Sequence, residues 1–152
     1  MPRTKCGFGD SEKIKGLDAL VSLGPTLLVD IGFDPKYVAA SGVPPPSAAI
    51  KGIWALVDTG ATECCIDGDL AKELALPVID RRHIAGIGGK KEVNIHLAQV
   101  FVPALMFTVN GAFAAVDLAA GGQQHKALIG RTFLRYFTMI YSGSTGDVEI
   151  FS

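Results

Sequence analysis

The stretch that decides the fold is IWALVDTGATECCI, residues 53–66, in which an apolar run is followed at once by Asp58-Thr59-Gly60. The run ends the segment IKGIWALV, and its continuous apolar character predicts a strand that is buried on both faces. Asp58 would then stand at the inner end of a buried strand, where a carboxylate costs free energy unless it is hydrogen-bonded, paired or functional. By itself the triplet fits a turn or a helix N-cap as well as it fits a catalytic site.

Composition limits the class of protein. The chain has 152 residues, 49% of them hydrophobic and 19% charged, with a formal net charge of -1. This length suits one domain with a core of its own. The near-balance of charge offers neither a nucleic-acid footprint nor a polybasic membrane patch. We predict one globular domain that binds neither nucleic acid nor membrane.

The N-terminal segment and the cysteines predict the compartment. Residues 1–22 lack the apolar core of a secretory signal, and the next apolar stretch is interrupted by Gly24-Pro25 and Asp30. The three cysteines cannot form a disulfide framework, because Cys64 and Cys65 are adjacent and badly placed to bridge each other. We expect a cytoplasmic protein in which residues 1–22 are an N-terminal extension, either disordered or a pro-segment that is removed by self-cleavage.

The remaining pattern is that of short strands. A proline-rich stretch, AASGVPPPSA, predicts a surface loop, and Asn110-Gly111 predicts a hairpin between two strands. Seven or eight strands and two short helices are typical of a closed or sandwiched β domain. The expected strands are 26–33, 50–57, 93–102, 104–111, 113–120, 127–130 and a hairpin over 138–151, and the expected helices are 67–76 and 131–137.

Three motifs in order, VDTGAT, AGIGG and ALIGRTFL, resemble the retropepsin family of single-lobe aspartic proteases over residues 24–151. The resemblance implies an all-β fold, a retropepsin-like closed β-barrel (the acid protease fold, single lobe) with one or two short helices, spanning residues 23–152. It also implies an aspartic endopeptidase that needs no cofactor and no metal. In such enzymes one ionised and one protonated aspartate share a proton and activate water.

The count of triplets implies the assembly. This chain supplies only Asp58-Thr59-Gly60, so a dyad requires a second copy related by a two-fold axis. The resemblance implies a homodimer with a peptide or protein substrate, in which Asp58 is the catalytic residue. Thr59 would join the two loops across the axis, Gly60 would let the backbone pass close to substrate, and Ala61 and Thr62 would lie along the substrate.

The resemblance also assigns the two later motifs. Gly86, Ile87, Gly88 and Gly89 match the tip of a flap that closes over the substrate. A plain glycine-rich turn is the alternative, and a phosphate loop is disfavoured because no Lys-Ser/Thr follows. The second motif matches the element that packs beneath the catalytic loop, with an arginine after it; its residues are Leu128, Ile129, Gly130 and Arg131.

Thr62 is a departure from the family, because many retroviral members carry an aspartate there that pairs with the arginine equivalent to Arg131. We expect Arg131 to contact Glu63 or a carbonyl instead.

Other candidate sites are disfavoured. The histidines, His83, His96 and His125, share no ligand spacing, so we predict no zinc site. Cys64 and Cys65 are expected to be small core residues rather than nucleophiles. The basic residues near the flap could favour acidic peptides, although exposed charges usually only solvate a surface; they are Arg81, Arg82, Lys90 and Lys91.

Two rival functions differ in class from the endopeptidase. One is a retropepsin-fold dimerisation or peptide-binding module with little or no turnover, and the other is an unrelated β-barrel binding protein. The intact triplet disfavours the module, because a protein released from catalysis has no need to keep a costly carboxylate pair.

Overall fold

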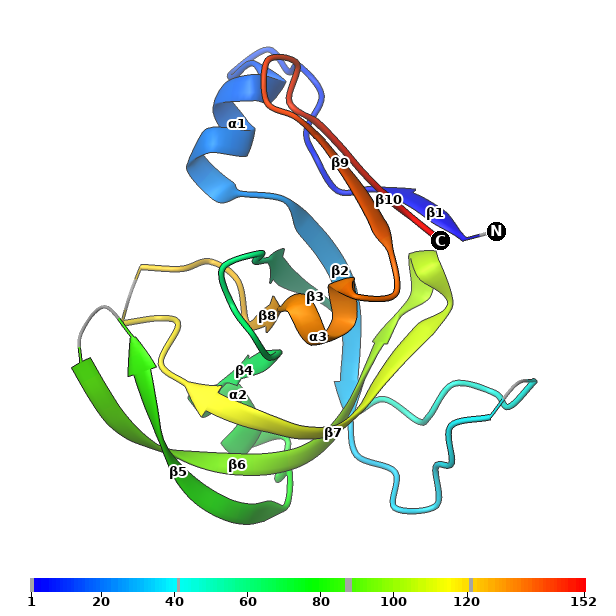
Figure 1. Cartoon of the computed structure of the whole chain (residues 1–152), viewed down its shortest axis with the longest axis vertical. Helices are drawn as coiled ribbons and strands as arrows, with labels where there is room; N and C mark the ends of the chain where they lie inside the picture. Colours follow the sequence, from blue (N-terminus) through cyan, green and yellow to red (C-terminus); the bar gives the residue numbers. More distant parts are fainter. Residues whose placement is uncertain (1, 41, 87–88, 121) are drawn as a thin grey trace.

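The computed structural model describes residues 2–40, 42–86, 89–120 and 122–152, and most of its regular structure is strand (Figure 1). The helices are short, as expected. The elements in chain order are β1 (Arg3–Lys5), α1 (Gly16–Leu23), β2 (Thr26–Gly32), β3 (Ile50–Val57), β4 (Cys65–Asp67), α2 (Gly68–Glu73), β5 (Val78–Gly86), β6 (Gly89–Val102), the 3-10 turn η1 (Pro103–Leu105), β7 (Phe107–Val116), β8 (Ala127–Ile129), α3 (Arg131–Leu134), β9 (Thr138–Ser142) and β10 (Asp147–Phe151).

The larger sheet closes into a barrel. Its strand order is β2-β3-β8-β4-β7-β6-β5, and β2 also pairs with β6, so every strand but β5 belongs to a ring. Most pairs are antiparallel, but β3 runs parallel to β8 and β4 runs parallel to β7. The expected closed all-β barrel is therefore confirmed, and β5 extends beyond it as one arm of a hairpin with β6.

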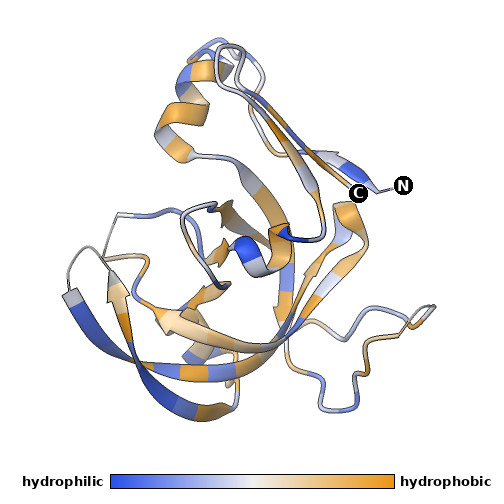
Figure 2. Cartoon of the chain, in the orientation of Figure 1, coloured by the Kyte–Doolittle hydropathy of each residue, from blue (hydrophilic) through white to orange (hydrophobic). Residues whose placement is uncertain are grey.

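Alternating side chains fill the barrel. Leu27, Val29 and Ile31 of β2 are buried, as are Val100 and Val102 of β6, because every second residue of a strand faces the same side. Figure 2 shows the same division in hydropathy, with hydrophilic residues concentrated on the β5–β6 hairpin and apolar ones on the ring. The polar character of residues 80–83 follows from their position outside the core, and this is why no strand was expected there.

The N-terminal segment packs onto the rest of the chain. β1 pairs with β10, and β9 completes a three-stranded sheet that brings the two ends of the chain together (Figure 1). Cys6 and Leu20 are buried in the same core as the barrel residues. A side chain on Gly146 would clash with the backbone of Gly16, so the β9–β10 turn fits closely against the start of α1. β1 was not expected, because a strand of three residues is too short to show a periodic pattern of apolar residues. The predicted boundary between an N-terminal extension and the main domain at residue 22 remains a prediction.

The expected hairpin at Asn110-Gly111 is wrong. β7 continues through both residues, which pair with Gln99 and Ala98 of the long strand β6. Gly111 has a φ of 143°, so the chain uses glycine's freedom for an irregularity within a strand rather than for a reversal. The long partner strand overrides the local turn signal.

The first of the two expected helices is α2, and it begins directly after its N-cap residue. Asp67 is the N-cap of α2: its Oδ2 accepts a hydrogen bond from Leu70 N at 3.3 Å. Its Oδ1 accepts from Leu118 N at 3.1 Å, which ties α2 to the end of β7. In the part of the chain that the structure describes, no helix is long and apolar enough to cross a membrane.

Candidate active site

Asp58 lies where β3 leaves the barrel. Val57 is buried, Asp58 is half-buried, and Thr59 and Gly60 are exposed, so the triplet projects from the barrel end. Asp58 N donates to Ile129 O at 2.9 Å, and Asp58 Oδ1 accepts from Gly60 N at 2.8 Å. The carboxylate thus has a fixed orientation and remains accessible.

β8 supports the loop from beneath. It pairs in parallel with β3, so that Ile129 stands beside Val57 and Gly130 reaches the underside of the loop. A Cβ on Gly130 would lie 2.5 Å from Glu63 O and 2.9 Å from Ala61 O, which leaves room for no side chain. The apolar-apolar-glycine motif is therefore adjacent to the loop that carries Asp58, and its supporting role stays a prediction.

The start of α3 is joined to the same loop. Arg131 N donates to Ala61 O at 2.9 Å, and Thr132 N donates to Thr62 O at 3.0 Å. Both loop carbonyls thus receive donors from the first turn of a helix, where backbone N–H groups have no partner within the helix. Thr132 was missed in the sequence, because no pattern marks a backbone donor.

The Arg131 side chain completes the connection. Its Nη1 donates to Thr59 O at 2.7 Å, and its Nη2 donates to Thr62 Oγ1 at 3.0 Å. Of the two partners expected for this guanidinium, a carbonyl is found. The Thr62 hydroxyl accepts the second bond.

The two cysteines beside the loop are packing residues. Cys64 is buried, and its Sγ accepts from Gly130 N at 3.4 Å. Burial raises the pKa of the Cys64 thiol. Burial, and then electrostatic interaction with Cys64, Glu63 and Asp58, raises the pKa of Cys65 to about 11. Both thiols therefore stay protonated at neutral pH, which makes them poor nucleophiles.

The two described residues of the glycine-rich motif, Gly86 and Gly89, are the last pair of the β5–β6 hairpin. The two strands pair from Val78–His96 to Gly86–Gly89, and Gly89 has a φ of 93°, which favours glycine. Ile87 and Gly88, both expected at the flap tip, lie outside the described residues. The hairpin expected around this motif is thus present.

The two arginines of this hairpin, Arg81 and Arg82, form ion pairs with acidic residues of the same hairpin. Arg81 Nε lies 2.7 Å from Glu92 Oε1, and Arg82 Nε lies 3.1 Å from Asp80 Oδ2. His83 Nε2 lies 3.7 Å from Glu92 Oε2. Much of the positive charge that could have attracted an acidic substrate is therefore neutralised locally.

A cavity of about 470 Å³ lies beneath the hairpin. The hairpin contributes Ile84 and Val93, α2 contributes Asp69 and Lys72, and β7 contributes Val116. Val93 also packs in a small apolar cluster with Ile95 and Ala114, separate from the barrel core. Asp58 is not among the described residues that line this cavity, so in one chain the carboxylate and the covered space are separate.

The buried histidines have structural partners. His96 Nδ1 lies 2.8 Å from Leu76 O, and His125 Nε2 lies 2.8 Å from Thr26 Oγ1. Burial lowers the pKa of His125, which favours its neutral form. Within the described ranges, no three His, Cys, Asp or Glu side chains are grouped so as to hold a metal ion.

Comparison with known proteins identifies a family model, Aspartyl protease, that matches residues 50–133. That range includes Asp58, the hairpin and Gly130-Arg131. Two solved structures are similar at 16% identity. EIAV protease in complex with the inhibitor HBY-793 has a TM-score of 0.48, with 74% of this chain and 86% of that chain covered. The simian foamy virus (mac) protease has a TM-score of 0.45, with 73% and 92% covered. No curated protein matches the chain.

Proposed function

The chain belongs to the aspartyl protease family, and from this premise we propose that it is an aspartic endopeptidase, active as a homodimer, without cofactor. The observation that carries the proposal is the geometry of Asp58. Its carboxylate is half-buried at the barrel end, oriented by Gly60 N and supported by β8 from beneath. Preorganised groups of this kind need little rearrangement when charge develops in a transition state.

The chemistry needs two carboxyl groups in different protonation states. One Asp58 carboxylate takes a proton from water while the oxygen of that water attacks the scissile carbonyl. The protonated Asp58 carboxyl of the second copy gives its proton to the carbonyl oxygen. As the C–N bond breaks, the amine nitrogen takes the proton held by the first carboxyl, and one hydroxyl of the tetrahedral intermediate gives its proton to the second carboxylate, which restores the dyad. Two close carboxyls share one proton because they cannot both ionise, so they titrate as a pair.

The proposed homodimer is supported by what one chain lacks. The sequence holds one Asp-Thr-Gly triplet, and the cavity beneath the hairpin has no contact with Asp58 in the described residues. Thr59 is exposed beside Asp58, which leaves its side chain accessible to a second copy. A two-fold axis near Thr59 would bring the Asp58 carboxyls together, with the same residues on both sides of the interface.

The remaining predicted residues have roles in binding the substrate. We assign Gly60, Ala61 and Thr62 to the rim along which an extended peptide lies, and the hairpin tip, Gly86 to Gly89, to its cover. The Ala61 and Thr62 carbonyls already accept bonds from α3. These carbonyls therefore fix the shape of the rim, and exclusion of water by the hairpin would strengthen the electrostatic interactions inside.

The free cysteines support a cytoplasmic location, where thiols remain reduced.

The test is the Asp58→Asn variant. We expect it to remain folded and dimeric and to lose cleavage of a randomised peptide library at neutral and mildly acid pH. Asp18→Asn is the matched control, because Asp18 is exposed on α1 and far from Asp58 in the sequence. Undiminished cleavage by Asp58→Asn would refute the mechanism. Binding of peptides without any cleavage by the wild-type protein would instead favour the peptide-binding module.

A further inference from the structure

β7 has an open edge along most of its length. Residues 107–114 pair with β6 on one side, whereas on the other side β4 pairs only with residues 114–116. Among the described residues, 107–113 thus have no strand on their second side. Such an edge presents backbone N–H and C=O groups that can pair with another extended chain.

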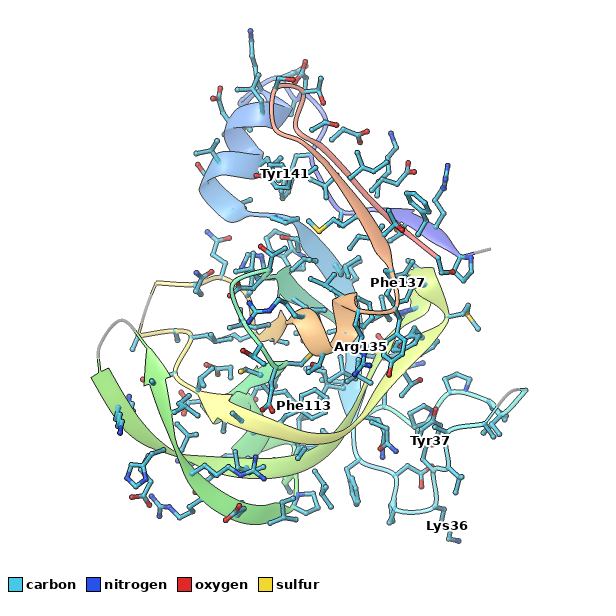
Figure 3. All side chains as sticks on the ribbon, in the orientation of Figure 1. Lys36, Tyr37, Phe113, Arg135, Phe137 and Tyr141 are labelled. Carbon is cyan, nitrogen blue, oxygen red and sulfur yellow. The ribbon has the colours of Figure 1, made fainter. Side chains whose placement is uncertain are left out.

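A groove of about 430 Å³ runs along this edge. Its first wall is β7 from Phe107 to Phe113, and its second wall is formed by Phe133 and Tyr136 of α3 and the turn after it. Figure 3 labels Phe113 on β7 and Arg135 at the end of α3, one residue from each wall. The open edge therefore has room beside it for a polypeptide backbone.

Aromatic rings line one end of the groove. The Phe107 ring lies 5.4 Å from that of Phe133 and 5.5 Å from that of Tyr136, measured between centroids. Phe133 is buried, but Tyr136 is 58% exposed and Phe107 is half-buried. An apolar or aromatic side chain placed here would bury surface that is now open to water.

The other end of the groove meets the catalytic loop. Glu63 and Cys64 line it, and they directly follow Thr62, which forms part of the proposed substrate rim. Thr132, whose N–H donates to Thr62 O, lines it too. An extended chain that leaves Asp58 along Ala61 and Thr62 would thus enter the groove without a break.

Charge gives the groove a direction. Glu63 lies at the end near the catalytic loop, and Arg135 lies beside Tyr136 at the aromatic end, with its guanidinium 5.5 Å from the Tyr136 ring centroid. Both side chains are exposed. Binding would therefore favour a segment that places a basic residue of its own near Glu63 and an acidic residue of its own near Arg135.

We propose that this groove binds a segment of the substrate polypeptide remote from the scissile bond, as an added strand on β7. The segment carries an apolar or aromatic side chain for the Phe107–Tyr136 wall and an acidic residue for Arg135. This inference rests on the proposed protease function. The bound segment gains main-chain hydrogen bonds from the edge and selectivity from the aromatic wall, which are the two parts of recognition by strand addition.

The experiment compares long and trimmed substrates. Peptides selected by cleavage from a randomised library are assayed at full length and after removal of the residues distant from the scissile bond. For wild-type protein we expect the long form to have the higher kcat/KM, through a lower KM. Tyr136→Ala should lower the ratio of long to trimmed kcat/KM about tenfold, the size of a typical anchor residue's contribution to an interface.

Two further variants make the test specific. Tyr141→Ala is the matched control, because Tyr141 is 53% exposed on β9 and does not line the groove among its described residues. It should leave the ratio unchanged. Arg135→Glu should reverse the preference for an acidic over a basic residue in the distal segment. Equal ratios for wild type, Tyr136→Ala and Tyr141→Ala would overturn the inference while the protease function stands.

Failure of the protease function gives a different result. If wild-type protein cleaves no peptide, the same library is panned on Asp58→Asn protein, and bound peptides are mapped by backbone amide chemical shifts. Shifts at residues 108–112 would support the groove as a binding site while refuting the protease. Peptide binding that leaves those amides unchanged, or no binding at all, would overturn the inference together with the protease function.

Discussion

The loop that carries Asp58 and the β5–β6 hairpin are built in different ways. The loop, residues 58–62, is held from two sides, because β8 lies beneath it and the first turn of α3 donates to its carbonyls. The hairpin extends beyond the barrel, and apart from strand pairing its described side-chain bonds are mostly exposed ion pairs. Packed contacts tolerate little change, whereas exposed ion pairs contribute little free energy. Substitutions should therefore cost much more around the loop than on the hairpin.

The largest effect should come from Gly130→Ala. Its Cβ would lie 2.5 Å from Glu63 O, a backbone atom that cannot rotate away, so the loop or β8 must shift. We expect a loss of about 3 kcal/mol in the free energy of unfolding, measured by urea denaturation, and a loss of peptide cleavage. Gly9→Ala is the control, because no atom lies within 4 Å of a Cβ there. Equal stability of the two variants would contradict the close fit beneath the loop.

A smaller effect should follow from Arg131→Lys. An ammonium cannot reproduce the planar fork that reaches Thr59 O and Thr62 Oγ1 together. We expect a loss of about 1 kcal/mol of stability and, under the proposed mechanism, a larger proportional loss of kcat, because Thr59 directly follows Asp58. Thr62→Val removes only one of the two hydrogen bonds. It should therefore lose less stability and less kcat than Arg131→Lys. If Thr62→Val lost more activity than Arg131→Lys, the guanidinium would not be what fixes the loop.

The smallest effect should come from Glu92→Gln on the hairpin. This change removes the ion pair of Arg81, whose side chain is 65% exposed, and the contact with His83. We expect stability to change by about 0.5 kcal/mol or less, measured by thermal denaturation. A loss as large as that of Arg131→Lys would show that charges on the hairpin support the fold, and the contrast between the two regions would fail.

Several features could be predicted because their signals are local. The aliphatic runs in 26–33 and 50–57 predicted two strands of the barrel, and Asp67 precedes a helix that it caps. The motif VDTGAT marks the candidate site, and its catalytic role stays a prediction. The strand β1 and the continuous β7 were not predicted, because each depends on a partner far along the chain: β10 for the first, and the long β6 for the second.

The sequence by itself determined that this chain offers one Asp-Thr-Gly triplet after an apolar strand, with later motifs in the order of an aspartic protease. Only the tertiary structure shows that the backbone around Gly130 leaves no room for a side chain. It alone also determines which acceptors, 72 and 69 residues away, bind Arg131, and which edge of β7 stays open. The physical reason is that periodicity reports which face of a segment is apolar. It contains no information on which distant segment will approach within hydrogen-bonding distance, and the geometry of this loop depends on those approaches.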